Sequence, residues 1–320
     1  MRKFLFLSLL ALLAACGKDE DCDYNNNNNN PQPEDLVTPA LYATLQQKTT
    51  DPYTGPMEVL PCQVDNGIYI GNYTANGTAV PFPAYYSITN GTGSSKNYPL
   101  RLPVGTYNLI YWGYPTYFNS PDAYLADPRL IVGEKLEGTS LGLRKVPSDT
   151  VYYPVHDLVH GSQIIKIGQE DMQAHLKRAS AALGVVVTET NGNAFNEAID
   201  SMWVYIGDIY SNVNYYSAQP EGSFKTICFG ISPNADRKEW SNEFVSVFPS
   251  RPTPLFQLFV QLSNGKIKSY GQRLASQLNA GTRTTVNLSM DGVLLVEGET
   301  GGFQVDKWKE QTDSIHFPLN

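Results

Sequence analysis

The sequence lacks the residue patterns that usually carry catalysis or hold metals and nucleotides. It has four cysteines, Cys16, Cys22, Cys62 and Cys228, and no Cys-x-x-Cys pair, so neither a disulfide framework nor a zinc site is predicted. A bridge between Cys62 and Cys228 stays open, although two free thiols are favoured. A phosphate-binding P-loop and a dinucleotide-binding glycine fingerprint are both missing, and no cofactor is expected. The formal net charge of −8 at pH 7 argues against binding to nucleic acid.

Long apolar runs are scarce as well, and the one present lies at residues 4–15. It is too short to cross a bilayer, which takes about 20 apolar residues, and it follows the basic residues Arg2 and Lys3, as in a secretory signal peptide. Residues 13–16, Leu-Ala-Ala-Cys, resemble the lipobox of bacterial lipoproteins, in which a peptidase cuts before the cysteine and its thiol is acylated. We therefore expect a lipoprotein signal peptide at 1–15 and a lipid such as palmitate on Cys16.

Residues 16–35 have the composition of a disordered tether. The six asparagines at 25–30 and the following Pro-Gln-Pro offer no apolar side chain to bury, so they cannot offset the entropy lost on ordering. Four residues after the lipidated cysteine resemble the acidic signal that sends many lipoproteins of one gram-negative phylum to the surface of the outer membrane. These are Lys18, Asp19, Glu20 and Asp21. We expect a protein that is exposed on the cell outer membrane and held clear of it.

The rest of the chain is patterned for β-strands. Alternating apolar residues at 256, 258, 260 and 262, and again at 286, 288 and 290, each predict a strand with one buried face. Six Asn-Gly or Asp-Gly dipeptides predict tight hairpins, because these residues tolerate positive φ. They begin at Asn66, Asn76, Asn90, Asn191, Asn264 and Asp291. A further strand is expected in "LRLPVGTYNLIYWGYP", with Tyr107, Leu109 and Tyr111 on one face.

Two segments have mixed patterns. In "QEDMQAHLKRASAALG", Met172, Leu176, Ala179 and Leu183 have near-helical spacing, but at period two the segment continues as a strand through "GVVVTE". The segment "AFNEAIDSM" is interpreted as a short helix before the strand "WVYIGDIY".

The β-rich body is long enough for two domains. About 285 residues follow the tether, and a change in pattern falls near 155–161, after Gly- and Pro-rich loops. We expect an all-β fold with two antiparallel β-sandwiches, at 36–157 and 158–320, each of which would bury a core of its own.

Four features in order resemble the fimbrillin superfamily, which includes the subunits and anchors of type V pili. These are the lipobox with its tether, "RLPVGTYNLIYWG", "HLKRASAALGVVVTE", and "FQVDKWKEQ" after the strand "TTVNLSM". The resemblance implies two transthyretin-like sandwiches, a strand at Met172–Thr188, and a structural or adhesive role in a fimbria without catalysis. It also implies partners among other fimbrial subunits, which such proteins bind by strand exchange.

The same resemblance separates anchors from shaft subunits. Shaft pilins are usually trimmed near the first strand by a trypsin-like, often arginine-specific, protease, but the basic residue available here is Lys48 and the next arginine is Arg101. We therefore favour an anchor that keeps its lipid, with cleavage at Lys48 left open. The C-terminal "TDSIHFPLN" is a candidate donor strand through Ile315 and Phe317, or alternatively an edge strand or a frayed tail.

Enzymatic interpretations have little support. The pattern Gly138-Thr-Ser140-Leu-Gly142 matches the G-x-S-x-G nucleophile elbow, but Pro147 follows soon after and the strand–helix alternation of a hydrolase is missing. His156 and His160 lie between Pro154 and Gly161, which leaves room for one helical turn at most, so packing is favoured over metal binding.

A glycan-binding lipoprotein of a polysaccharide-uptake system is the alternative. Aromatic side chains expected at the surface could stack on sugar rings. They are Tyr114, Tyr117, Phe118, Tyr215 and Tyr216. Host or bacterial surface glycans or proteins are thus further candidate partners.

Overall fold

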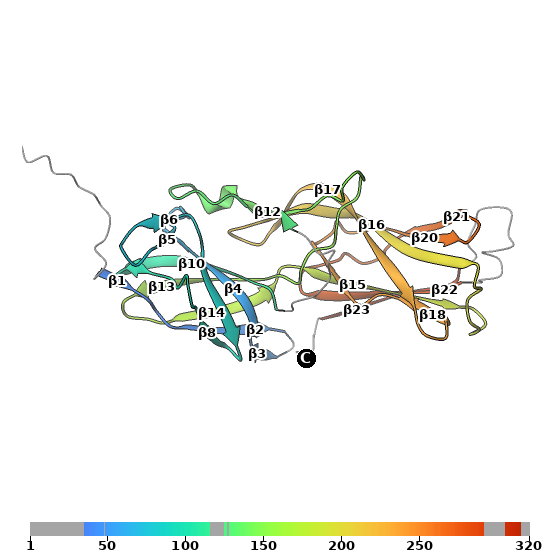
Figure 1. The fold of residues 1–320 in the computed structure, drawn as a ribbon, viewed down its shortest axis with the longest axis horizontal. Helices are drawn as coiled ribbons and strands as arrows, with labels where there is room; N and C mark the ends of the chain where they lie inside the picture. The colour runs from blue at the N-terminus through green and yellow to red at the C-terminus, as the bar shows by residue number, and fades with distance from the viewer. Residues whose placement is uncertain (1–34, 48, 116–124, 127, 291–304, 315–320) are drawn as a thin grey trace, which may run out of the picture. The chain divides into compact units, whose positions relative to one another are not determined.

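The computed structural model describes residues 35–47, 49–115, 125–126 and 128–290, and the backbone of 305–314 (Figure 1). Within these residues the regular structure is β-strand, apart from one 3₁₀ turn, η2, at Leu136–Gly138. Two short ladders lie outside the large sheets. They pair β1 (Leu36–Val37) with β9 (Leu102–Pro103), and β5 (Asn72–Tyr73) with β6 (Ala79–Val80). The predicted all-β class is confirmed.

The first large sheet has eight strands in the order β14-β13-β10-β4-β7-β8-β2-β3. Its members are β2 (Leu41–Gln46), β3 (Thr50–Pro52), β4 (Gly55–Cys62), β7 (Ala84–Thr89), β8 (Thr92–Ser94), β10 (Gly105–Gly113), β13 (Val159–Ile167) and β14 (Met172–Arg178). β14 also pairs in parallel with β2, from Met172↔Leu41 to Leu176↔Leu45. This pairing closes the sheet on itself, so most of its strands have no open edge.

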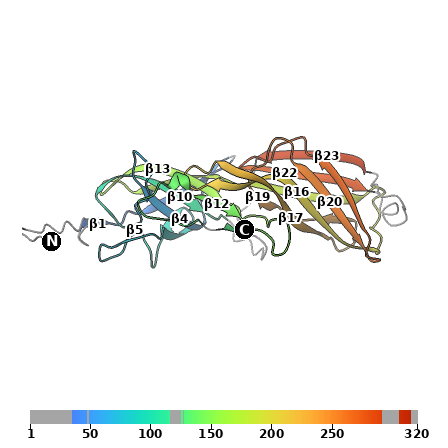
Figure 2. The ribbon, with the colours of Figure 1, turned by 90° about the horizontal axis from the view of Figure 1, so that it is seen from above.

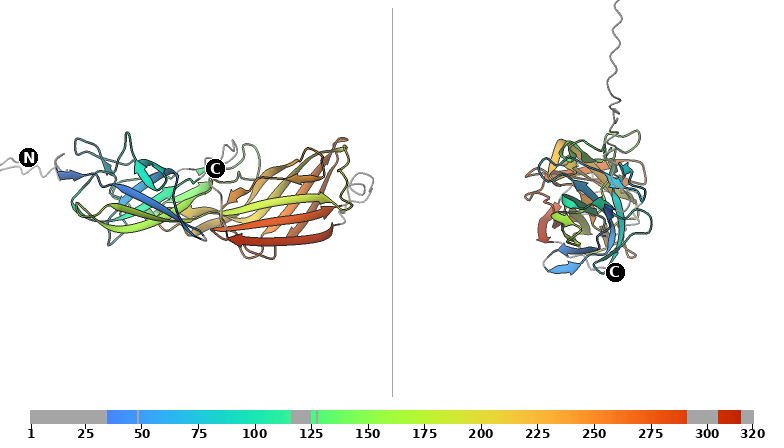
Figure 3. Two further views of the ribbon diagram at one scale, coloured as in Figure 1. Left: turned by 90° about the horizontal axis from the view of Figure 1, so that it is seen from below. Right: turned by 90° about the vertical axis from the view of Figure 1, so that its left-hand side faces the viewer.

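The second large sheet has eleven strands. They are β11 (Leu125–Ala126), β12 (Ser140–Leu143), β15 (Ala181–Glu189), β16 (Ile199–Asn214), β17 (Pro220–Pro233), β18 (Glu239–Ser241), β19 (Val245–Val247), β20 (Leu255–Leu262), β21 (Ile267–Arg273), β22 (Thr282–Met290) and β23 (Val305–Ser314). β16 pairs with β17 on one side and with β20 on the other (Figure 2). β15 pairs in parallel with β22, which pairs antiparallel with β23; Figure 3 shows these strands side by side in yellow-green and red.

The strand patterns read from the sequence agree with the structure. In β20 the even-numbered residues from Phe256 to Leu262 are buried and their neighbours are half-buried, and β22 alternates in the same way. The Asn90-Gly91 dipeptide has positive φ at both residues and joins β7 to β8. Gly265 likewise has positive φ between β20 and β21. The dipeptide at Asp291 lies outside the described residues.

β10 departs from the one-sided pattern expected for it. Leu109 and Tyr111 line the core of the first sheet, as predicted, but Ile110 and Trp112 on the opposite face are also fully buried. This second face packs in the larger core, which the second sheet dominates. β10 therefore separates two cores, and burial of both faces removes the alternation that usually identifies a strand.

Of the two mixed segments, one prediction is confirmed and one is wrong. The segment at 172–188 is mainly strand, as β14 and β15, which are separated by Ala179 and Ser180. The short helix expected in "AFNEAIDSM" is a turn followed by β16. The Asn196 side chain accepts a hydrogen bond from the Ala198 N–H, and its carbonyl accepts one from the Ile199 N–H. Ile199 then pairs with Leu262, so local turn chemistry and sheet pairing override helix propensity.

Sheet membership does not change at residue 157. β13 and β14 follow that position and belong to the first sheet, whereas β11 and β12 precede it and pair toward β16 in the second. Without β13, the long strand β10 would expose its backbone groups along one edge. The division into two domains at 36–157 and 158–320 stays a prediction. The strands just before residue 157 belong to the second sheet, and the strands just after it belong to the first.

Candidate functional site

The residues that the sequence singled out for membrane attachment, processing and strand donation all lie outside the described part of the chain. They are Cys16, Lys18, Asp19, Glu20, Asp21, Lys48, Ile315 and Phe317. Their roles stay predictions. The structure does describe the residues on either side of Lys48 and the strand that ends just before Ile315. These neighbouring residues show which parts of the fold processing or strand donation would affect.

Strand β2, which precedes Lys48, contributes to the core of the first sheet. Leu41, Ala43 and Leu45 are each 2–3% exposed and pack among the residues of that core. On one side β2 pairs with β14 over five residues, and on the other it meets β8 at a single position, Tyr42↔Thr92. The strand is thus part of the folded body and not an extension of the tether.

A buried ion pair holds the end of β2. The Arg178 Nε lies 3.1 and 3.0 Å from the two carboxylate oxygens of Asp157, and these side chains are 3% and 1% exposed. The Arg178 Nη1 donates to the Gln47 Oε1 at 3.0 Å, and the Ser180 Oγ donates to the Asp157 Oδ1 at 3.1 Å. Because Arg178 ends β14, this network ties the residue before Lys48 to the strand beside it.

At the other end of the chain, β23 lies against β22. The ladder runs from Met290↔Val305 to Thr282↔Ser314, so the first residue of β22 faces the last residue of β23. Among the described residues the pairing thus extends to Ser314, which precedes Ile315.

A cluster of aromatic residues joins the first sheet to the turn after β16. The Trp112 indole N–H donates to the Tyr215 carbonyl at 2.8 Å, and the two rings stack with their centroids 5.3 Å apart. The His160 Nε2 lies 3.1 Å from the Tyr216 carbonyl, and burial lowers the pKa of His160 to about 4. The Tyr215 hydroxyl donates to Glu58 at 2.7 Å.

This cluster corrects part of the surface expected for sugar stacking. Tyr215 is 2% exposed, because its ring packs on Trp112 and its hydroxyl binds a carboxylate. Tyr114 and Tyr216 are half-buried, while Tyr117 and Phe118 lie outside the described residues. None of the described three is an exposed aromatic.

The structural contexts that enzyme motifs require do not form around Ser140 and the two histidines. Ser140 opens β12, its Oγ donates to Glu221, and the strand that follows pairs with β16 where a hydrolase would have a helix. His156 packs edge-on against Tyr114, while His160 contacts Trp112. Within the described ranges no three potential metal-binding side chains gather.

The cysteines that the structure describes are both free thiols. Cys62 is buried at the end of β4, and burial raises its pKa to about 12. Cys228 is half-buried in β17, and burial raises its pKa to about 11. The model thus contains no Cys62–Cys228 bridge.

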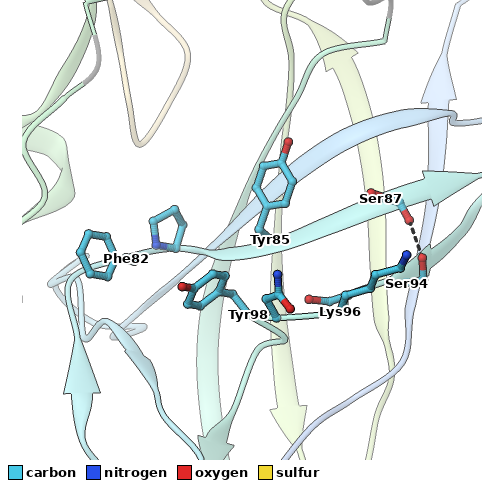
Figure 4. A pocket seen from close by; sticks show the side chains of 9 residues that line it. Phe82, Tyr85, Ser87, Ser94, Lys96 and Tyr98 are labelled. Carbon is cyan, nitrogen blue, oxygen red and sulfur yellow. Dashed lines mark hydrogen bonds between the residues drawn. The ribbon is translucent and has the colours of Figure 1, made fainter.

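Exposed aromatic side chains line a hollow that the sequence did not single out, and we call it the aromatic groove. It is a hollow of about 820 Å³ lined by Phe82, Pro83, Tyr85, Ser87 and residues 94–98 (Figure 4). Phe82, Tyr85 and Tyr98 are 63%, 43% and 58% exposed. In Figure 4 Phe82 and Tyr98 lie toward one end of the groove, Ser87, Ser94 and Lys96 lie toward the other, and Tyr85 lies between them.

Hydrogen bonds fix both walls of the groove. The Tyr85 N–H donates to the Tyr98 carbonyl at 2.9 Å, and the Leu100 N–H donates to the Tyr86 hydroxyl at 2.9 Å. At the far end the Ser94 Oγ lies 3.3 Å from the Ser87 carbonyl. The alternation in "PAYYSIT", which buries Tyr86 and exposes Tyr85, is the sequence signal that could have located this site.

Comparisons with known proteins identify a family and a similar fold. The model of the fimbrillin-A associated anchor proteins Mfa1 and Mfa2 matches residues 23–314. The fimbrial anchor protein Mfa2 from Porphyromonas gingivalis has a similar structure, with a TM-score of 0.50, 11% identity, and coverage of 87% of this chain and 98% of that one. A candidate adhesin from Bacteroides ovatus also has a TM-score of 0.50, with 12% identity over 80% and 90% of the two chains. No curated protein sequence matches this chain.

Proposed function

The chain belongs to the family of fimbrillin-A associated anchor proteins, and on that basis we propose that it anchors an adhesive fimbria at the cell surface. The members that give this family its name are fimbrial anchors, and the role is structural and adhesive, with no catalysis. Three parts of the proposal follow: a lipid on the membrane side, an intact folded body, and a segment that engages the next subunit.

The first part is attachment to the outer membrane through Cys16. Two or three acyl chains on this residue would insert stably, where one chain binds only marginally. The 19 residues from Gly17 to Asp35 would reach about 60 Å when extended, which lifts the body clear of the lipid headgroups. Replacing residues 18–21 with alanine should keep the lipid but remove the protein from the reach of a protease added outside the cell.

The second part is that the chain remains uncut at Lys48. β2 supplies three side chains to the core of the first sheet, and removing even one such leucine side chain costs about 2–5 kcal/mol. The Arg178–Gln47 hydrogen bond adds a direct tie at the end of this strand. Because the folded body depends on β2, cleavage at Lys48 would remove a strand of its core. The burial of β2 is therefore the observation that supports an uncut anchor with its N-terminal lipid.

The third part is strand donation by the C-terminal segment. The described part of the β22–β23 ladder reaches Ser314, which pairs with Thr282, the first residue of β22. Residues 315–320 follow Ser314 directly in the chain. With Ile315 and Phe317 two positions apart, an extended segment would direct both side chains to one face. We propose that this segment completes the sheet of a neighbouring fimbrial subunit.

Photo-crosslinking in the native bacterium tests this arrangement. A photoreactive phenylalanine analogue at position 317 should form a covalent adduct with another fimbrial subunit. The same analogue at Lys238, in the exposed turn between β17 and β18, serves as the control and should not. Adducts that stay within one chain, or equal adducts from both positions, would contradict strand donation.

A second candidate function is the binding of surface glycans, which the aromatic groove favours. Single exposed apolar residues scattered over a protein surface are normal, but three exposed rings gathered in one hollow indicate a binding site. Saturable binding of any oligosaccharide, lost in Tyr98→Ala, would support this function, and its absence across a glycan panel would oppose it.

A further inference from the structure

We propose that the aromatic groove binds an acidic oligosaccharide, a short chain of sugar rings that carry carboxylate groups. The inference rests on the glycan-binding function proposed above and specifies its ligand class. It draws on four properties of the groove: the exposure of its rings, the pairing of its backbone, its charge and its size.

The rings of the groove are open to solvent, whereas some tyrosines nearby in the chain pack in the core of the first sheet. Tyr53 and Tyr86 are 1% and 4% exposed, whereas Phe82 and Tyr98 exceed half exposure. The face of an aromatic ring is electrostatically negative, and the C–H groups on one face of a sugar ring are weakly positive, so the two stack favourably. A row of exposed rings therefore suits a chain of sugars.

The β7 wall of the groove is already paired along both of its edges, which argues against a peptide that would bind to β7 as an added strand. On one edge β7 pairs with β4, from Gly55↔Ile88 to Val59↔Ala84. On the other it pairs with β8 as far as Ser87↔Ser94, and the Tyr85 N–H then donates to the Tyr98 carbonyl. Strand addition needs unpaired backbone groups. Recognition here must therefore come from side chains.

The charge of the groove is opposite to that of the chain. Among the described residues that line it, Lys96 is the charged one, and none is a carboxylate, although the whole chain carries −8. The hydroxyl of Ser87 and the carboxamide of Asn97 can donate to and accept from sugar hydroxyls, and the Ser94 hydroxyl, which donates to the Ser87 carbonyl, can accept from them. Electrostatic complementarity then favours a ligand that carries carboxylates, which can pair with the Lys96 ammonium group.

The size of the groove fits several rings. Its volume of about 820 Å³ lies within the usual range for small-molecule sites. A second hollow of about 470 Å³ shares Phe82 and Pro83 with it, and its lining also includes Tyr114 and the oppositely charged residues Glu58 and Arg129. A ligand can thus extend past Phe82, which favours an oligosaccharide over a single sugar.

Calorimetry on the full-length chain in detergent tests the proposal with two hexasaccharides, acidic oligogalacturonate and neutral maltohexaose. We expect binding of the acidic sugar that weakens as salt rises from 20 to 300 mM, because exposed ion pairs are screened. Tyr98→Ala should weaken it at least about fivefold, as loss of one stacking ring does elsewhere, and Lys96→Gln should weaken it about threefold. Tyr42→Ala removes a tyrosine of β2 that is 43% exposed, and Lys238→Gln removes an exposed lysine; both should leave binding unchanged.

The outcomes separate the ligand class from the wider function. Equal binding of both sugars, unaffected by Lys96→Gln, would overturn the acidic assignment and leave glycan binding standing. Binding of neither sugar would contradict glycan binding by the aromatic groove. Binding that Tyr98→Ala leaves unchanged, in a variant with wild-type thermal stability, would place the sugar site elsewhere and contradict it as well.

Discussion

The Trp112 side chain of the first sheet and the main chain of Tyr215, beside the second sheet, are joined by a hydrogen bond of 2.8 Å from indole to carbonyl. Their rings also stack, and both residues are buried. The contact links strand β10 to the turn after β16, two segments about a hundred residues apart in the chain. It is one of the points at which the two large sheets share a single core.

Replacing Trp112 with phenylalanine should test how much this link contributes. The ring would stay but the donor would be lost, leaving a buried carbonyl unpaired and a small cavity, so we expect a loss of about 2–4 kcal/mol in the free energy of unfolding. Trp240→Phe is the matched control. Trp240 is 3% exposed and its indole N–H has no partner among the described residues, so its replacement loses packing and part of the contact between its ring and the Arg237 guanidinium, but no hydrogen bond. Equal losses in urea titrations of the two variants would mean that the hydrogen bond contributes nothing.

The Arg178–Asp157 pair should behave differently from an ion pair at the surface. Arg178→Met leaves the buried Asp157 carboxylate without its partner, which costs about 3–5 kcal/mol. Arg273→Met breaks a 2.8 Å pair with Asp208 in which Arg273 is half exposed, and it should cost about 1 kcal/mol or less. The free energies of unfolding at pH 7 decide the matter, and a loss for Arg178→Met as small as that of the control would argue against the tie at the end of β2.

His160 should contribute an acid-sensitive component of stability. Its pKa is about 4 in the folded chain against an ordinary value of 6.5, so the unfolded chain binds more protons between these values. Stability should therefore be fully present above pH 6.5 and decrease as the pH falls toward 4, by up to about 3 kcal/mol. His160→Gln can still donate to Tyr216 but does not titrate. Denaturant titrations at pH 7, 5.5 and 4.5 should give a shallower decline for this variant, and parallel declines would contradict the assignment.

The two thiols should be slow to alkylate in the folded protein. Burial raises the pKa of Cys62 to about 12 and that of Cys228 to about 11, so little thiolate forms at pH 8. Brief treatment with iodoacetamide should leave both unmodified, and the same treatment in denaturant should modify both. A Cys62–Cys228 disulfide recovered from the denatured, non-reduced sample would contradict the free-thiol state.

Much of the fold could be predicted because its signals are local. The alternation of buried and half-buried residues in β20 and β22 follows from side-chain direction, and the Asn-Gly turns follow from backbone sterics. Both depend only on residues that are close together in the sequence. The sheet membership of β13 could not be read in this way. It depends on pairing with β10, some fifty residues earlier, and both faces of β10 are buried.

The candidate site was less accessible from sequence. The aromatics that the composition suggested for the surface include Tyr215, which tertiary contacts with Trp112 and Glu58 bury. The aromatic groove depends on Tyr98 lying next to Tyr85, and the hydrogen bond from the Tyr85 N–H in β7 to the Tyr98 carbonyl, in the segment after β8, holds the two together. The alternation in β7 indicates that Tyr85 is exposed, but it does not indicate that Tyr98 lies beside it.

The most direct test of the anchor account is to map the N-terminus of this protein by mass spectrometry in sheared surface filaments and in the residual outer membrane. The account predicts an acylated Cys16 at the N-terminus of an uncut chain in the membrane fraction, cross-linked to fimbrial subunits. A filament-bound chain that begins after Lys48 would contradict it and make the protein a processed, polymerising subunit.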